Sequence, residues 1–344
     1  MISFTCDYTE GAHPDILQRL CETNMVQAQG YGEDPFCESA RQRIRAAIGC
    51  PEADVFFLTG GTQTNATVID ALLHSHEGVV AVQTGHIAVH EAGAIEFGGH
   101  KVITLPSRNG KMTANDLQHY LQSFHNDPNW PHMVFPGMAY VSHPTEYGTI
   151  YSKQELADIH QVCQEYGIPL FVDGARLGYA LACDKADFDL QQLAQLCNVF
   201  YIGGTKVGAL CGEAVVFPQG DAPKHLFTCI KQHGALLAKG RLLGLQFDTL
   251  FANDLYLRIS RHAIDMAMRL KKAFAQKDIP FYIDSPTNQQ FPILTQRQSQ
   301  QLKNQVLFEN WETLPDDRIV TRFATSWATT VENIKFLETL IHQL

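Results

Sequence analysis

The chain has 344 residues, of which 45% are hydrophobic and 18% are charged, and its formal net charge at pH 7 is -10. This composition is ordinary for a globular enzyme and excludes extended disorder. The acidic balance excludes nucleic acid and anionic membranes as main partners, because both require clustered Lys and Arg, although a local basic pocket for a phosphate is still allowed.

The cysteines and the N-terminal residues indicate the cellular compartment in which the protein is expected. Nine cysteines are an odd number, and none of them form a Cys-x-x-Cys pair, so neither a disulfide framework nor a zinc knuckle is indicated. The first residues lack a basic region followed by an apolar stretch, and no run of about 18 apolar residues occurs. We therefore expect a cytoplasmic protein that is neither exported nor membrane-spanning.

The predicted elements divide the chain into three parts. Residues 1–41 are expected to form an irregular, glycine-bearing arm. In residues 42–245, short apolar runs alternate with helical periodicity, which predicts a large α/β domain with a doubly wound, mostly parallel sheet. The expected strands are 55–59, 79–83, 101–105, 133–141, 170–172, 199–202 and 214–217.

The clearest helix of the large domain is predicted over residues 152–166. Ser152 and Glu155 form a capping box at its start, and apolar residues then recur on one face. This helix should therefore cover one side of the sheet.

Residues 246–344 are expected to form a smaller α+β domain. A long helix is predicted over 255–276, and Thr329 with Glu332 predicts a capping box for a last helix over 331–344. The strands expected between these helices are 281–284, 290–294 and 318–326.

Two charged residues follow apolar runs at places where ligands bind. Asp173 ends the run 169–172, and Lys206 follows the run 199–202 after Gly203-Gly204-Thr205. In an open α/β sheet, ligands bind outside the carboxyl ends of the strands, so both charges should enter one site.

An amine and an acid in such a site fit one cofactor. Burial disfavours the charged form of a lysine, and a neutral Lys206 can attack an aldehyde. Pyridoxal phosphate has such an aldehyde, and its ring nitrogen requires an acidic partner, which Asp173 would supply. The alternative is that both are ordinary surface charges.

A glycine pair lies between a predicted strand and a predicted helix. Gly60-Gly61-Thr62 follows the run 55–59, so free N–H groups of the helix start could bind an anion, helped by the Thr62 hydroxyl. No Gly-x-Gly-x-x-Gly or P-loop pattern is present. A plain tight turn is the alternative interpretation.

His86 follows the run 79–82 and opens the next helical segment, where its flat ring could stack on an aromatic cofactor. His86, His90 and Glu91 also form His-x3-His-Glu, and two histidines four residues apart can bind zinc. The zincin order is absent and no third ligand is marked, so we expect no metal and a solvated or helix-capping His90.

With these residues assembled, the chain resembles the threonine aldolase family, in the β-eliminating lyase group of fold-type I pyridoxal phosphate enzymes. Six segments resemble family segments in the family's order and span nearly the whole chain. These segments are 24–36, 59–66, 85–93, 172–176, 200–206 and 318–327.

The resemblance implies roles toward the cofactor. Lys206 would form the Schiff base, and Asp173 would pair with the pyridine nitrogen. Arg176 would donate to the phenolic oxygen, and His86 would stack on the ring. The phosphate would lie at Gly61 and Thr62.

The resemblance also implies roles toward the substrate. Arg322 would bind the carboxylate, which its planar guanidinium suits; pairing with an acidic neighbour is the alternative. Cys6 stands where many members carry a serine, so a hydroxyl contact to substrate would be lost. Glu146 stands where many carry a histidine near the substrate hydroxyl, and the base could be His86, a water or Glu146.

The expected activity is cleavage of L-threonine or a related β-hydroxy-α-amino acid to glycine and an aldehyde by a pyridoxal phosphate lyase. Another reaction on the same cofactor, such as β-elimination or transamination, and a non-catalytic protein of this fold are the alternatives. The resemblance also implies a homodimer or homotetramer with active sites at the dimer interface, where Lys231 and Arg241 would reach the neighbouring phosphate.

Overall fold

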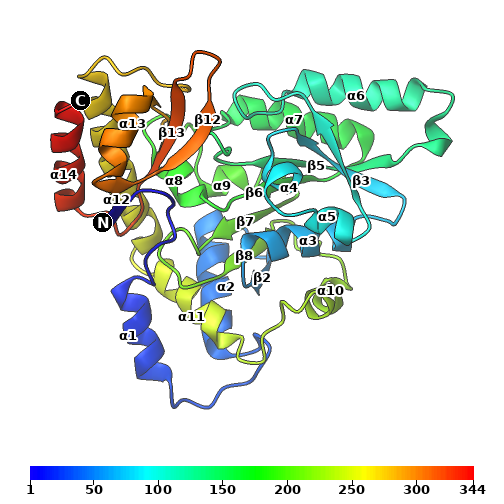
Figure 1. The fold of residues 1–344 in the computed structure, drawn as a ribbon. Helices are drawn as coiled ribbons and strands as arrows, with labels where there is room; N and C mark the ends of the chain where they lie inside the picture. Colours follow the sequence, from blue (N-terminus) through cyan, green and yellow to red (C-terminus); the bar gives the residue numbers. More distant parts are fainter.

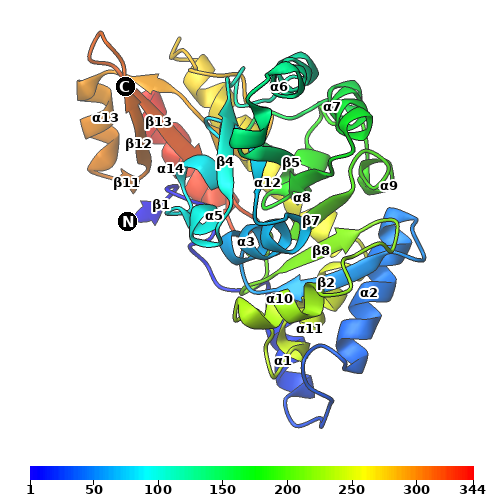
Figure 2. The same ribbon diagram turned by 90° about the vertical axis from the view of Figure 1, so that its right-hand side faces the viewer.

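The computed structural model describes residues 1–344, and a seven-stranded mixed sheet forms its centre (Figures 1 and 2). The strands from β7 to β4 are parallel, whereas β8 runs antiparallel to both β2 and β7. In sheet order they are β2 (Asp54–Leu58), β8 (Glu213–Phe217), β7 (Val199–Gly203), β6 (Leu170–Asp173), β5 (Phe135–Ser142), β3 (Glu77–Val82) and β4 (Lys101–Leu105). The predicted doubly wound, mostly parallel sheet is confirmed.

Helices cover both faces of this sheet, because its central strands bury side chains on both sides. Val80 and Val82 of β3 belong to the apolar core on one face, while Val79 and Ala81 belong to the core on the other. The first face carries α2 (Pro35–Ile48), α6 (Ala114–Asn126) and α7 (Lys153–Tyr166), and the second carries α3 (Gly61–Leu72), α5 (Ala94–Phe97) and α10 (Leu226–Gln232).

The helix predicted over 152–166 is α7. Its capping box is confirmed, since the Ser152 side chain accepts from the N–H of Glu155 and the Glu155 side chain accepts from the N–H of Ser152. The helix ends at Gly167, which takes a left-handed conformation with φ of 66°.

The expectation of an irregular arm over residues 1–41 is wrong in two stretches. α1 spans Pro14–Thr23, and α2 already begins at Pro35. Each helix starts with proline, whose fixed φ suits the first turn, and His13 or Asp34 accepts a hydrogen bond from the first-turn backbone.

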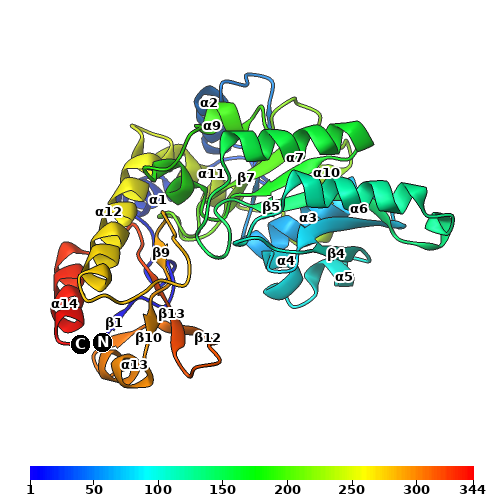
Figure 3. The same ribbon diagram turned by 90° about the horizontal axis from the view of Figure 1, so that it is seen from above.

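A smaller unit lies beside the large sheet (Figures 1 and 3) and has its own apolar core. Its strands are β9 (Gln289–Gln290), β10 (Ile293–Leu294), β12 (Glu309–Thr313) and β13 (Ile319–Ala324), with β13 pairing with the other three. Its helices are α12 (Leu255–Ala275), α13 (Gln296–Lys303) and α14 (Val331–His342). We propose residues 42–245 and 246–344 as the two domains.

The N-terminus contributes to this smaller unit. β1 (Ile2–Ser3) pairs in parallel with β11 (Val306–Leu307), and Phe4 belongs to the same apolar core. Both ends of the chain therefore lie at this side of the molecule (Figure 1). The remaining helices are α4 (His86–Val89), η1 (Trp130–His132), α8 (Leu177–Ala182), α9 (Leu190–Leu193) and α11 (Arg241–Leu250).

Three C-terminal predictions need correction. The segment 281–284 is not a strand, and only Phe281 makes an isolated bridge, to Pro292. The run 290–294 is interrupted, giving β9 and β10. The cap of the last helix is Thr330, whose side chain accepts from the N–H of Asn333.

None of the helices combines the length and the apolar character that crossing a membrane requires.

Candidate active site

The carboxyl ends of the parallel strands bring together six residues that the sequence marked. Asp173 is the last residue of β6, and Lys206 follows β7 by three residues. A pocket at this edge is lined by Gly61, His86, Glu146, Asp173, Arg176 and Lys206, among others. The rule for ligand sites in open α/β sheets therefore holds here.

Two glycines let the turns after β6 and β7 approach each other. A Cβ on Gly174 would lie 1.9 Å from the carbonyl oxygen of Tyr201, and a Cβ on Gly203 would lie 2.2 Å from that of Ala175. Neither position can therefore carry a side chain without moving backbone, and Asp173 and Lys206 are held close as a result.

Asp173 is a buried, fully engaged carboxylate. It accepts hydrogen bonds from the hydroxyls of Tyr140 and Tyr201, and it also accepts one from the side-chain amide of Asn65 at 3.0 Å. Burial opposes ionisation, but the nearby His86 and these two hydroxyls outweigh it, so the pKa of the carboxyl lies below its ordinary value. A permanent negative charge thus faces the pocket.

Lys206 is partly buried, and its Nζ lies 5.9 Å from the ring centroid of Tyr8. Burial and the positive charge of Arg176 lower the pKa of its ammonium, against the pull of the surrounding carboxylates. Its amine therefore loses a proton more readily than an exposed lysine does, as a nucleophilic lysine requires.

Arg176 is held by a carboxylate that the sequence did not mark for a role. Its Nε and Nη2 donate to Asp7 at 2.7 and 3.0 Å, and Asn288 donates to the same carboxylate at 2.9 Å. Asp7 is completely buried, and its pKa is lowered because Arg176 and Lys206 together outweigh the cost of burial. The N-terminal segment thus orients the guanidinium in the site.

Glu146 lies next to His86. Its Oε1 accepts the hydroxyl of Ser142 at 2.6 Å and the backbone N–H of His86 at 2.9 Å, while its Oε2 is buried without a partner. Burial raises the pKa of this carboxyl, against the hydrogen bond from Ser142. A buried carboxyl oxygen without a partner is unusual in a folded protein, and here it belongs to a residue that lines the pocket.

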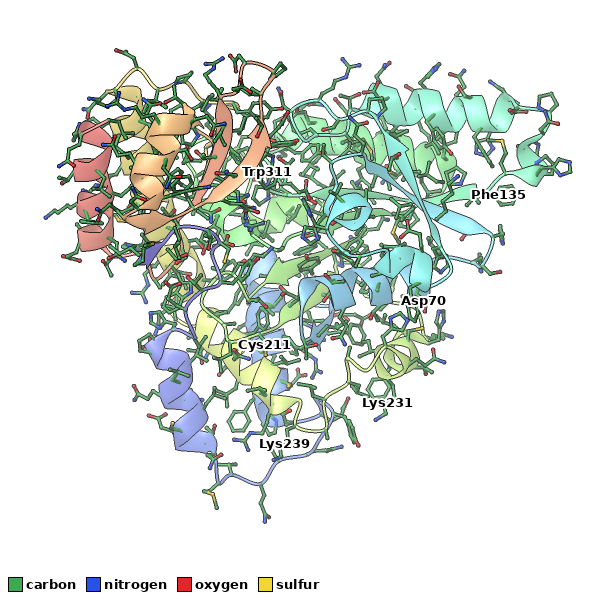
Figure 4. All side chains as sticks on the ribbon, in the orientation of Figure 1. Asp70, Phe135, Cys211, Lys231, Lys239 and Trp311 are labelled. Atoms are coloured by element: carbon green, nitrogen blue, oxygen red, sulfur yellow. The ribbon has the colours of Figure 1, made fainter.

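Arg322 lines a second cavity of about 230 Å³, which it shares with Lys206 and His86. Its guanidinium lies 5.0 Å from the ring centroid of Trp311, which is labelled on β12 in Figure 4. The remaining lining residues are Tyr8, His90, Glu146, Arg176, Glu309 and Trp311. Arg322 and Lys206 therefore open into one space.

Several contacts hold Arg322 in place. Its Nη2 donates to the carbonyl of Thr5 at 3.1 Å and its Nη1 to the side chain of Gln289 at 3.3 Å. Glu309 forms an ion pair with it, while its Nε is buried without a partner.

The other predicted site residues lie at the edge of the two cavities or outside them. Gly61 and Thr62 begin α3, whose N-cap Gly60 provides no side-chain hydrogen bond, so first-turn N–H groups are free for an anion. Cys6 lies between Thr5 and Asp7 in the chain, but it lines neither cavity.

The site residues that could not be predicted from the sequence mostly form hydrogen bonds or ion pairs with the residues that could. Tyr140 and Tyr201 could have been suspected, because each is a polar aromatic residue within a run that should be buried. Asn65, Asp7 and Glu309 carry no comparable signal, because only the fold places them beside the charges that they contact.

The fold has solved counterparts. A threonine aldolase from Leishmania major matches with a TM-score of 0.96 and 40% identity, covering 100% of this chain and 99% of that one. An aspartate aminotransferase from Thermus thermophilus matches with a TM-score of 0.72 at 13% identity, which indicates a shared fold. The architecture is that of the fold-type I pyridoxal phosphate enzymes.

Sequence comparison identifies the family within this structural class. The family model of the beta-eliminating lyases matches residues 4–296. A low specificity L-threonine aldolase from Pseudomonas aeruginosa is 30% identical over 282 residues, which cover 80% of this chain and 79% of the relative. The chain therefore belongs to the beta-eliminating lyase family, within its threonine aldolase group.

Proposed function

We propose that the protein is a pyridoxal phosphate-dependent lyase that cleaves L-threonine or a related β-hydroxy-α-amino acid to glycine and an aldehyde. The observation that carries the proposal is the convergence of Lys206, Asp173 and Arg322 at two cavities that share lining residues. The names of the two threonine aldolases reported above support the choice of substrate.

The residues present fit the cofactor. A buried, ionised Asp173 matches a protonated ring nitrogen, and the uncapped start of α3 at Gly61 and Thr62 matches a phosphate. The lowered pKa of Lys206 matches an amine that attacks an aldehyde. When bound, pyridoxal phosphate supplies that aldehyde and a ring that withdraws electrons from bonds to the substrate Cα.

The other side chains have separate roles toward the cofactor and the substrate. We assign stacking against the ring to His86 and donation to the phenolic oxygen to Arg176, which Asp7 keeps in orientation. Arg322 holds the substrate carboxylate, and Cys6 directly follows Thr5, whose carbonyl oxygen accepts a hydrogen bond from Arg322. Fixing the carboxylate selects which bond at Cα stands perpendicular to the ring, and hence which bond breaks.

A base must also take the proton of the substrate hydroxyl. His86 and Glu146 both line the two cavities, so both are placed for this step. The raised pKa of Glu146 means that it holds a proton more readily than an exposed glutamate and can return one to the product.

The direct test is incubation of the purified protein and pyridoxal phosphate with L-threonine. We expect glycine and acetaldehyde in equal amounts. Formation of 2-oxobutyrate without glycine would instead establish β-elimination, and conversion of added pyruvate to alanine would establish transamination. Either result would refute the aldolase assignment.

We further propose that the protein is a homodimer, or a tetramer of two such dimers. Large apolar side chains are exposed around residues 24–34 and on α10, which is typical of an association surface: Met25, Val26, Tyr31 and Phe227. Light scattering during size-exclusion chromatography should give at least twice the mass of one chain, and a monomer at micromolar concentration would contradict this.

The two basic residues expected at that interface already have partners within the chain. Lys231, labelled in Figure 4, lies 4.6 Å from the ring centroid of Tyr31, and Arg241 donates to the carbonyls of Thr23 and Val26. A role toward a neighbouring phosphate remains a proposal for Lys231, whose ammonium makes no ion pair.

A further inference from the structure

A buried carboxylate that none of these roles uses lies behind His86. The side chain of Glu91 is fully buried, and its Oε1 lies 2.7 Å from Nδ1 of His86. The same oxygen accepts the side-chain amide of Asn65 at 2.7 Å. His86 begins α4 and Glu91 follows its end, whereas Asn65 lies in α3, so two segments meet at this point.

The amide of Asn65 joins two carboxylates. Its Nδ2 donates to Glu91 and, at 3.0 Å, to Asp173. Since both neighbours accept hydrogen bonds, only the amide nitrogen can face them, and both of its hydrogens are used. Glu91 is therefore connected through one side chain to the proposed partner of the cofactor nitrogen.

These contacts decide which nitrogen of His86 keeps its proton. Oε1 of Glu91 already accepts a hydrogen bond from Asn65, and its 2.7 Å contact with Nδ1 of His86 is a second hydrogen bond when the imidazole nitrogen is the donor. Nδ1 must therefore carry a hydrogen. Nε2 makes no hydrogen bond within the protein, and the ring lines both cavities.

We propose that Glu91 is a positioning residue that keeps a proton on Nδ1 of His86, so that His86 exchanges protons with ligands only through Nε2. This inference rests on the proposed function for the identity of the ligand, but not for the state of the ring. A carboxylate that orients a histidine in this way is a recurrent arrangement in enzymes.

The arrangement also fixes the plane of the ring. The backbone N–H of His86 donates to Glu146 while its side chain donates to Glu91, so the residue is held at both ends. A ring that stacks on a planar cofactor and also transfers a proton needs both the plane and the free nitrogen defined.

The test begins with the wild-type apoprotein labelled with ¹⁵N-histidine, at alkaline pH where imidazole is neutral. His86 is assigned by its loss in His86→Gln. We expect one tautomer, with Nδ1 protonated and Nε2 bare. A protonated Nε2 with a bare Nδ1 would overturn the proposal without any reference to turnover.

Two substitutions separate the hydrogen bond from simple packing. Glu91→Gln keeps an oxygen that can accept from both neighbours, whereas Glu91→Leu keeps similar volume without an acceptor. We expect the Gln variant to retain the single tautomer and the Leu variant to show both forms, with kcat for L-threonine reduced about 10- to 100-fold in the latter and KM little changed.

Exposed Glu96, on α5, gives the control Glu96→Gln, which should leave the spectrum unchanged. A Leu variant that keeps both the single tautomer and wild-type kcat would overturn the proposal, as would equal losses in the Gln and Leu variants. Because the spectra require no substrate, a protein that fails to cleave threonine would still reveal whether Glu91 sets the tautomer.

Discussion

Glu309 lies directly opposite Arg322 on the neighbouring strand, and the two side chains form an ion pair. The guanidinium is mostly buried, whereas the carboxylate is 45% exposed and can move into solvent. The residue that we propose for the substrate carboxylate is therefore paired with a carboxylate of the protein. A substrate must share Arg322 with Glu309 or displace it.

Replacing Glu309 by Gln should therefore strengthen substrate binding. Because exposed ion pairs contribute only about 0.2 to 1 kcal/mol, we expect KM for L-threonine to fall about 2- to 5-fold with kcat unchanged. Glu312→Gln, on the same strand, is the matched control. A higher KM in Glu309→Gln would show that the carboxylate orients the guanidinium instead of competing with substrate.

Lys206→Ala should remove both the visible absorbance of the bound cofactor and turnover, because no other amine lines the two cavities. Borohydride reduction of the wild-type holoenzyme followed by peptide mapping should label residue 206. Lys101→Ala, an exposed lysine on β4, should behave as wild type. Labelling at another lysine would contradict the assignment of the site.

The large sheet could be predicted because the interior strands are apolar on both faces. Residues 101–105 are expected as a strand and form β4, and the other strands of this sheet differ from expectation by at most two residues at either end. The small domain was harder to predict. β12 reads Glu-Asn-Trp-Glu-Thr, an exposed edge strand without apolar alternation, so only its pairing with β13 reveals it.

The residues of the candidate site likewise include some that could be predicted from the sequence and some that could not. Lys206 and Asp173 could be located because a charge that follows an apolar strand is visible in the sequence. Asp7 could not, because its contact with Arg176 joins residues 169 positions apart. Glu91 was visible only as part of a zinc pattern, because its burial and its contact with Asn65 depend on the fold.

The turn after Asp173 gives a test of stability. Gly174→Ala would place a methyl group 1.9 Å from the Tyr201 carbonyl, so the turn must shift, and we expect a loss of about 3 kcal/mol in the free energy of unfolding. At Gly60 a Cβ meets nothing within 4 Å, and its φ of -171° is extended, so Gly60→Ala should cost at most about 1 kcal/mol. Urea denaturation measures both, and equal stability of the two variants would refute the packing argument.

Glu213 on β8 predicts a dependence of stability on pH. Its carboxylate accepts the hydroxyl of Thr205 at 2.8 Å and the N–H of Gly204 at 3.2 Å, in the turn that leads to Lys206. Burial raises the pKa of this carboxyl from 4.5 to about 8, against these hydrogen bonds and the charge of Lys206. The folded protein therefore keeps a proton that the unfolded chain releases near pH 4.5.

Between pH 4.5 and about 8 the Glu213 carboxyl holds a proton in the folded state that it lacks in the unfolded state, so the contribution of Glu213 to the free energy of unfolding falls as pH rises. The side chain of Glu213→Gln cannot ionise, so this contribution disappears in the variant. As pH rises, the free energy of unfolding of the variant should therefore increase relative to that of the wild type by up to about 1.4 kcal/mol per pH unit. Urea denaturation of the two apoproteins across this range measures the difference. Glu96→Gln should run parallel to the wild type, and a Glu213→Gln curve that also ran parallel would show that Glu213 is ionised throughout.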